Sequence, residues 1–126
     1  MKRIGIGLFV CAAVCIAIGF AGCTNKADEN KPLSEVQADA QKMDVEQLKA
    51  MATKYKEAIT AKKADVDKVM AKMKDVPLAD AMGKEATSLK QEVDALAKSI
   101  KALNERFDVY YNKLVEKGAD VSGLSI

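Results

Sequence analysis

The fold is decided by one stretch, Met82–Leu114, which reads MGKEATSLKQEVDALAKSIKALNERFDVYYNKL. Its apolar residues recur at alternating steps of four and three, which is the spacing of a heptad seam on a long α-helix. The seam consists of Met82, Ala86, Leu89, Val93, Leu96, Ile100, Leu103, Phe107, Tyr110 and Leu114. A seam of this length predicts a helix that packs against another helix along its whole length.

An earlier stretch, Val45–Val76, repeats the pattern. Its seam positions are Val45, Leu48, Ala52, Tyr55, Ile59, Lys62, Val66, Val69, Met73 and Val76, of which Lys62 alone is charged. Residues 75–78 separate the two seams, and a gap this short allows only a reversal of the chain. The sequence therefore predicts an all-α fold: a long, coiled-coil-like antiparallel helical hairpin over residues 44–118, with its turn near 75–78.

The short reversal also predicts how the two arms face each other. Pro77 suits the first turn of the second helix, where its missing N–H costs no hydrogen bond. In the antiparallel pairing that follows, Met73 faces Met82 and Tyr55 faces Ile100. The two seams then interlock along the whole hairpin.

A short additional helix is expected before the hairpin, over residues 33–43. Ser34 followed by Gln37 is the spacing of a capping box at its start. Its apolar face is out of phase with the later seam, and Asp44 can cap a new helix at that point. A kink and a true turn near Met43–Asp44 both fit this pattern.

Polar segments flank the helical part. Residues 23–32 are rich in Thr, Asn, Lys, Asp and Glu, and we expect a flexible tether there. At the other end Gly118 suits the position just after a helix, where a left-handed backbone is common. Residues 119–126 are then a C-terminal tail.

The first residues of the chain have the pattern expected of an export signal. Lys2 and Arg3 precede the uncharged run 4–22, which ends in Phe20-Ala21-Gly22-Cys23. This arrangement resembles the lipobox of bacterial lipoprotein signal peptides, with Phe20 where Leu is usual. The resemblance implies that residues 1–22 are removed and that Cys23 receives a diacylglycerol and an N-acyl chain such as palmitate.

Two other interpretations of the leader stay open. A run of this length could span a bilayer as an uncleaved anchor, and Ala21-Gly22 also suits the cleavage site of an ordinary secretory leader. All three put the helices outside the cytoplasm, because Lys2 and Arg3 stay on the cytoplasmic side. Thr24, rather than Asp, follows Cys23. The resemblance therefore implies a protein lipid-anchored to a bacterial membrane, the outer rather than the inner one where two are present.

Composition narrows the class of function. The formal charge is +2 and Lys2 and Arg3 account for all of it, so the rest of the chain is balanced. A balanced chain lacks the basic surface that nucleic-acid binding requires. The sequence holds no His, the commonest general base, and no motif for catalysis, metal or cofactor binding stands out. We expect no enzyme activity and no cofactor other than the lipid on Cys23.

The apolar stripe is wider than a two-helix hairpin needs. Met51, Met70 and Tyr111 flank the seams at positions that are charged in many isolated coiled coils, and they form a possible contact surface. The short helix, a second copy in a homodimer, or an envelope protein partner could cover it. The expected function is a non-enzymatic structural, spacer or protein-interaction module of the cell envelope. The alternative is a helical carrier of a lipid or other apolar ligand.

Overall fold

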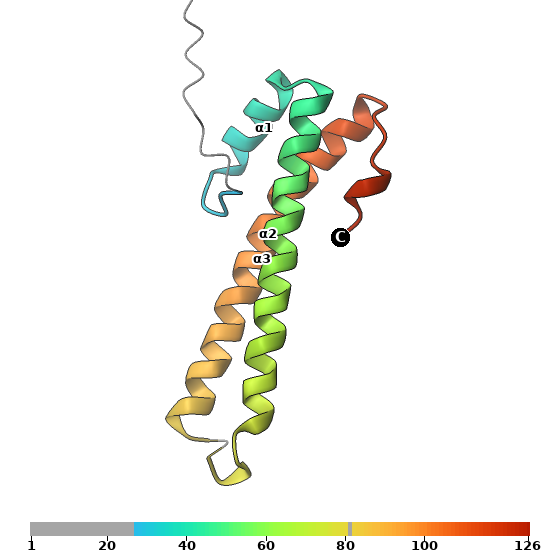
Figure 1. Cartoon of the computed structure of the whole chain (residues 1–126). Coiled ribbons are helices and arrows are strands. Elements are labelled where there is room, and N and C mark those ends of the chain that lie inside the picture. Colours follow the sequence, from blue (N-terminus) through green and yellow to red (C-terminus); the bar gives the residue numbers. More distant parts are fainter. Residues whose placement is uncertain (1–26, 81) are drawn as a thin grey trace, which may run out of the picture.

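A computed structural model describes residues 27–80 and 82–126, so the leader and Cys23 lie outside the described residues. The elements in order are α1 (Leu33–Lys42), α2 (Val45–Asp75), the short 3-10 helix η1 (Leu78–Asp80), α3 (Lys84–Glu116) and a second short 3-10 helix, η2 (Ser122–Leu124). The predicted all-α class is confirmed, and α2 and α3 pack against each other as the two arms of a hairpin (Figure 1). None of the helices in these two ranges is long and apolar enough to cross a membrane.

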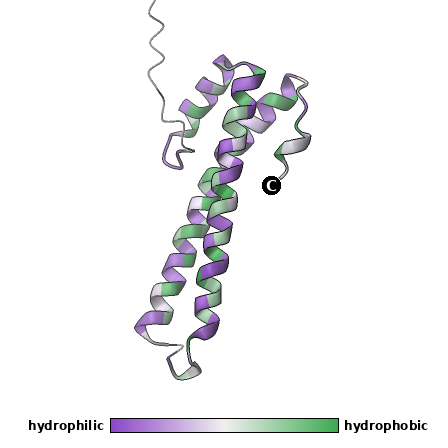
Figure 2. Cartoon of the chain, in the orientation of Figure 1, coloured by the Kyte–Doolittle hydropathy of each residue, from purple (hydrophilic) through white to green (hydrophobic). Residues whose placement is uncertain are grey.

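The described part of the chain has two unequal parts, which we call the head and the stalk. The head comprises α1, residues 45–59 of α2, residues 103–116 of α3 and the C-terminal segment, whereas the stalk is the rest of α2 and α3 with their connection (Figure 1). Along both long helices hydrophobic and hydrophilic residues alternate turn by turn (Figure 2), as one apolar stripe per helix requires. The core cluster lies in the head and consists of Val36, Ala40, Leu48, Ala52, Tyr55, Ile59, Leu103, Phe107, Tyr110, Leu114 and Leu124. The stalk is thus a two-helix extension of a better-packed head.

A true turn separates α1 from α2. Met43 and Asp44 both have extended backbone angles, and Asp44 forms a reciprocal capping box with Gln47. The Gln47 N–H donates to Asp44 Oδ1 at 2.8 Å, and the Asp44 N–H donates to Gln47 Oε1 at 3.2 Å. The predicted Asp44 cap is therefore confirmed. The predicted Ser34 cap is wrong, because Ser34 lies inside α1, which begins at Leu33, and the Pro32 carbonyl accepts the first hydrogen bonds of the helix.

The connection between the arms is longer than the sequence suggested, and the register changes with it. α2 ends at Asp75 and α3 begins only at Lys84, so Pro77 precedes η1 instead of starting the second arm. The predicted register put Tyr55 against Ile100, but the Tyr55 ring stacks on Tyr110 with the centroids 5.6 Å apart.

The longer connection explains this shift of the pairing along α3. Met73, predicted to face Met82, instead lines a hollow with Ala86. The partner of Tyr55 lies ten residues further along α3 than predicted, and that of Met73 lies four residues further along. The two helices still pack against each other, although the individual partners differ.

Gly83 makes the longer connection possible. Its N–H donates to the Asp80 carbonyl at 2.7 Å, closing a tight turn just before α3. A Cβ at this position would lie 2.9 Å from the same carbonyl oxygen. A residue with a side chain would have to open the turn, so glycine is required here by close approach of the backbone.

The C-terminal segment folds back onto α2. Gly118 has φ of 66°, and the N–H groups of Gly118 and Ala119 donate to the carbonyls of Val115 and Leu114, which is a Schellman motif. The predicted Gly118 cap is confirmed. Leu124 of η2 is 6% exposed and belongs to the core cluster. Residues 119–126 are therefore part of the head.

Candidate functional site

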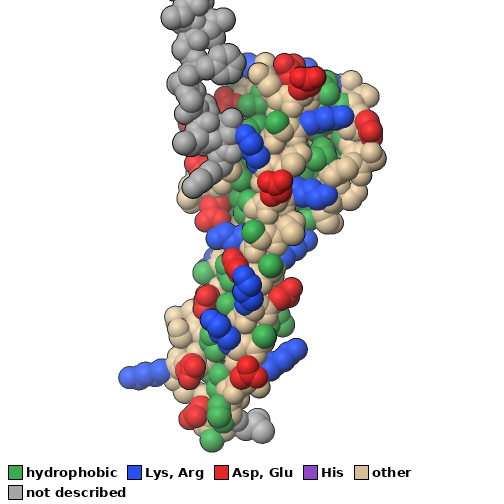
Figure 3. All heavy atoms as spheres, in the orientation of Figure 1, with side chains coloured by type: hydrophobic (Ala, Val, Ile, Leu, Met, Phe, Trp, Pro, Cys, Tyr) green, Lys and Arg blue, Asp and Glu red, His purple; other side chains and the backbone are tan. Residues whose placement is uncertain are grey.

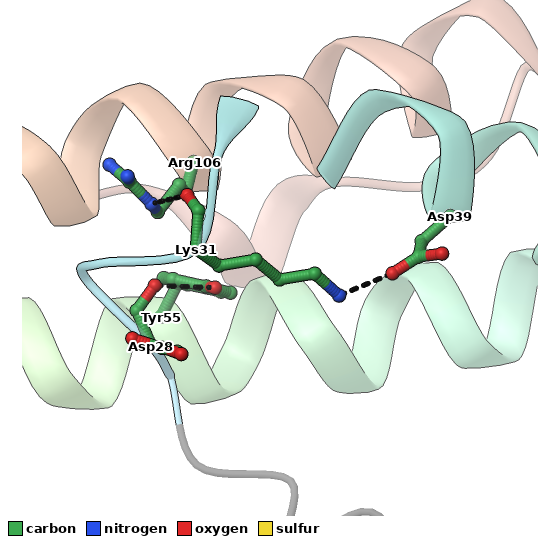
Figure 4. A network of polar contacts seen from close by, with 5 residues as sticks. All are labelled: Asp28, Lys31, Asp39, Tyr55 and Arg106. Carbon is green, nitrogen blue, oxygen red and sulfur yellow. Dashed lines mark hydrogen bonds and ion pairs between the residues drawn. The ribbon is translucent and has the colours of Figure 1, made fainter. Parts of the chain in front are cut away.

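The segment just before α1 is docked on the hairpin. We call residues 27–32 the docking segment. The Tyr55 hydroxyl of α2 donates to the Asp28 carbonyl at 3.2 Å, and Arg106 Nε of α3 donates to the Lys31 carbonyl at 2.9 Å (Figure 4). We expected a flexible tether over residues 23–32, but its second half, residues 27–32, is bound to the hairpin. Backbone carbonyls make these bonds, so a polar composition did not prevent docking.

Arg106 is the buried charged residue of the described core. Its side chain lies between α3 and the docking segment, it is 8% exposed, and a second nitrogen, Nη1, donates to the Ala102 carbonyl at 2.6 Å. A guanidinium suits this position because it stays charged and presents several N–H donors in fixed directions. The sequence does hold a signal for it: the only other arginine is Arg3 in the leader, and every other basic residue is Lys.

An ion pair closes the docking segment against α1. Lys31 Nζ donates to Asp39 Oδ2, joining the docking segment to the second turn of α1 (Figure 4). The hydrogen bond to Asp39 raises the pKa of the Lys31 ammonium. Together with Tyr55 and Arg106, this pair ties the segment to all three helices of the head.

A stack of two tyrosines lies beside the docked backbone. The Tyr55 and Tyr110 rings are inclined by 28°, and each residue is 1% exposed. Burial raises the pKa of Tyr55, and it raises the pKa of Tyr110 to about 12. Both phenols are therefore neutral at ordinary pH, which a buried position requires.

The three predicted contact residues do not share one exposed surface. Met51 and Tyr111 are partly buried and pack against the head's core, where Tyr111 stacks on Phe107 with the ring centroids 5.7 Å apart. Met70 lies on the stalk and is 48% exposed. Within the head, other segments of the same chain cover much of the wide apolar stripe that the sequence predicted. Met70 lies outside the head, on the stalk.

Three surface hollows differ in their linings. The largest, about 310 Å³, lies between α1 and α3 and is lined by Gln37, Ala40, Gln41, Glu105, Asp108, Val109, Asn112, Lys113 and Glu116. The other two lie at the far end of the stalk. One of about 260 Å³ is lined by Lys72, Asp75, Val76, Pro77, Glu85 and Leu89, and one of about 190 Å³ by Met73, Val76, Ala86 and Lys90. The last is the most apolar, and we call it the stalk-end hollow.

Its volume limits what the stalk-end hollow can hold. Sites that enclose a whole drug-sized ligand measure ~300–1,000 Å³. At about 190 Å³, with Lys90 as the one charged residue of its lining, the hollow has room for a single large apolar side chain.

Comparison with protein-family models, with curated proteins and with solved structures finds no match to this chain. In the two ranges that the structure describes, no group of His, Cys, Asp and Glu side chains could hold a metal ion.

Proposed function

We propose that this protein is a lipid-anchored, non-enzymatic spacer or protein-interaction module of the bacterial cell envelope. Cys23 carries the diacylglycerol and the N-acyl chain and holds the head at the membrane, outside the cytoplasm. Thr24 after the cysteine favours the outer membrane where two membranes are present. The leader sequence and the charge balance of the remaining chain support the proposal.

The docking segment is the observation that carries the structural part of the proposal. Cys23 lies four residues before Ala27, which packs against the head's core. Four residues span at most ~14 Å when fully extended. A lipid on Cys23 would therefore hold this flank of the head close to the membrane surface.

The same distance restricts the orientation of the hairpin. Tyr55, which binds the docking segment, lies 20 residues before the end of α2 at Asp75. At 1.5 Å per residue the stalk extends ~30 Å beyond that point. Because the tether is about half as long, the stalk end cannot point straight at the anchoring membrane. An anchored hairpin lies along the membrane or directs its stalk away from it, as a spacer requires.

The intact mass of the full chain extracted from membranes tests the anchor, with a Cys23→Ser variant beside it. We expect the wild type to lack residues 1–22 and to carry acyl mass that the variant loses. A wild type that keeps Lys2 and Arg3 without added lipid would contradict the proposal and favour an uncleaved membrane anchor. A cleaved chain without acyl mass would favour ordinary secretion.

A further inference from the structure

The far end of the stalk carries exposed methionines around an apolar hollow. Met82, beside the start of α3, is 95% exposed, and Met70 is 48% exposed. Met70 and Met73 are three residues apart on α2 and so lie on neighbouring parts of one helix face. Hydrophobic side chains are visible at this end of the molecule in Figure 3. Methionine side chains are flexible and polarizable, and they are common on surfaces that bind partner proteins.

Lys90 is the one charged residue in the lining of the hollow. Lys90 is exposed, and none of the three ion pairs in the described part of the chain involves it. A carboxylate placed beside a bound apolar group would form a charge-assisted hydrogen bond with this ammonium.

We infer that the stalk end binds an acidic amphipathic helix of a partner protein, which inserts one large apolar side chain into the stalk-end hollow. The residues concerned are Met70, Met73, Val76, Met82, Ala86 and Lys90. The volume of the hollow fits one inserted side chain, the methionines extend the apolar contact along a helix, and Lys90 selects a neighbouring Asp or Glu of the partner. This is the helix-in-groove mode of recognition, with this protein as the receptor.

A second copy of the chain suits the hollow less well than such a partner. A two-fold symmetric pair presents the same patch from both copies. Contact centred on the hollow would then bring the two Lys90 ammonium groups together, and like charges repel.

A membrane surface is also a poorer occupant, and this step rests on the proposed lipid anchor. Arg106, which binds the docking segment, lies 16 residues after Lys90 on α3. At 100° per residue the two side chains point roughly 160° apart around the helix axis. An anchor that brings the docking segment to the membrane therefore turns the stalk-end hollow away from it.

Methyl NMR of the full chain, purified in detergent and labelled at the methionine methyl groups, tests the inference. The probes are two synthetic helical peptides with the same leucine spacing, one with glutamates and one with lysines at the flanking positions. We expect the glutamate peptide to shift the Met70, Met73 and Met82 signals. The Met43 and Met51 signals report on the head and are expected to stay unchanged.

Two variants test the contributions of the hollow and of the Lys90 charge separately. Ala86→Leu fills the hollow, and we expect it to weaken binding of the glutamate peptide about tenfold or more. Lys90→Glu is expected to reverse the preference between the two peptides. Lys101→Glu is the matched control, because it makes the same change at an exposed lysine on α3 outside the hollow. Unchanged Met43 and Met51 signals show that each variant keeps its folded head.

Several results would overturn the inference. Equal affinity for the two peptides, no shift at Met70 and Met73, or an Ala86→Leu variant that binds like the wild type would each exclude the proposed contact. Shifts of the stalk signals on dilution without peptide would identify a second copy as the occupant. The outcome is independent of Cys23 acylation, so failure here is distinguishable from failure of the proposed anchor by the intact-mass measurement.

Discussion

Replacing Arg106 with alanine tests how strongly the docking segment is held. The guanidinium donates to the Lys31 carbonyl at 2.9 Å and to the Ala102 carbonyl at 2.6 Å while it is 8% exposed. A hydrogen bond from a charged donor contributes ~1.5–3 kcal/mol net. The Ala102 carbonyl lies within α3, so the bond to Lys31 is the larger loss.

We expect Arg106→Ala to lower the free energy of unfolding by about 2–3 kcal/mol, because the packing of the aliphatic stem is lost as well. For a domain of about 100 residues this corresponds to a fall in Tm of roughly 10–20 °C. Lys101→Ala removes an exposed basic side chain from the same helix and is expected to stay within ~0.5 kcal/mol of the wild type. Arg106→Lys is expected to fall in between, since one ammonium cannot match the directions of the guanidinium donors.

Denaturant unfolding measures the free energy, and hydrogen exchange of the docking segment and α1 locates the effect. Relative to the wild type, the substitution is expected to speed hydrogen exchange more over residues 27–42 than over the stalk. An Arg106→Ala protein that matches Lys101→Ala in stability and keeps wild-type exchange over 27–42 would refute the reasoning, because Arg106 would then not hold the segment.

Three further predictions concern the head. Gly118→Ala is expected to cost about 1 kcal/mol in denaturant unfolding, since φ is 66° there, whereas Gly123→Ala, which has equally open surroundings and no positive φ, is expected to be nearly neutral; equal effects would exclude backbone conformation as the cause. Burial raises the pKa of Tyr110 to about 12, so the folded state keeps a proton that the unfolded state loses above its ordinary pKa of ~10. Stability is then fully present below that pH and falls by about 3 kcal/mol as pH rises toward the folded pKa; alkaline unfolding followed by tyrosinate absorbance checks this, and a Tyr110→Phe protein with an undiminished alkaline loss would contradict it. A double-mutant cycle between Tyr55 and Tyr110 is expected to give a coupling of ~0.5–1.5 kcal/mol, and coupling of Tyr55 to Ile100 instead would restore the register predicted from the sequence.

The class of the fold was predictable because it depends on periodicity. Two heptad seams separated by a short gap allow little besides an antiparallel hairpin. Asp44 and Gly118 were predictable for a related reason, since each local signal coincides with a break in the apolar pattern. These features depend only on residues near one another in the chain.

The register was not predictable by the same route. A heptad seam looks the same after a shift of seven residues, so periodicity alone does not fix which residues of α3 face the seam of Val45–Val76. The length of the connection contributes to that choice. That length depends on where α3 starts, and Gly83 delays the start through a close contact with the Asp80 carbonyl.

The docking segment was missed for a different physical reason. Composition indicates whether side chains favour burial, but this segment is held through its backbone carbonyls by Tyr55 and Arg106. Those two residues lie on different helices and far from the segment in sequence. Arg106 was the available signal, because a single arginine among lysines marks a position that needs several directed donors.

The division into head and stalk has a thermodynamic consequence for the proposed binding. The fully buried large side chains lie in the head, and the most buried residue of the stalk is Val69 at 4% exposure. Regions with few buried apolar contacts open at lower free energy than the core. A partner helix on the stalk would supply the third layer that the docking segment, α1 and the C-terminal segment supply to the head. Binding would therefore stabilise the stalk most, so the slowing of hydrogen exchange by the glutamate peptide should be greatest in the stalk.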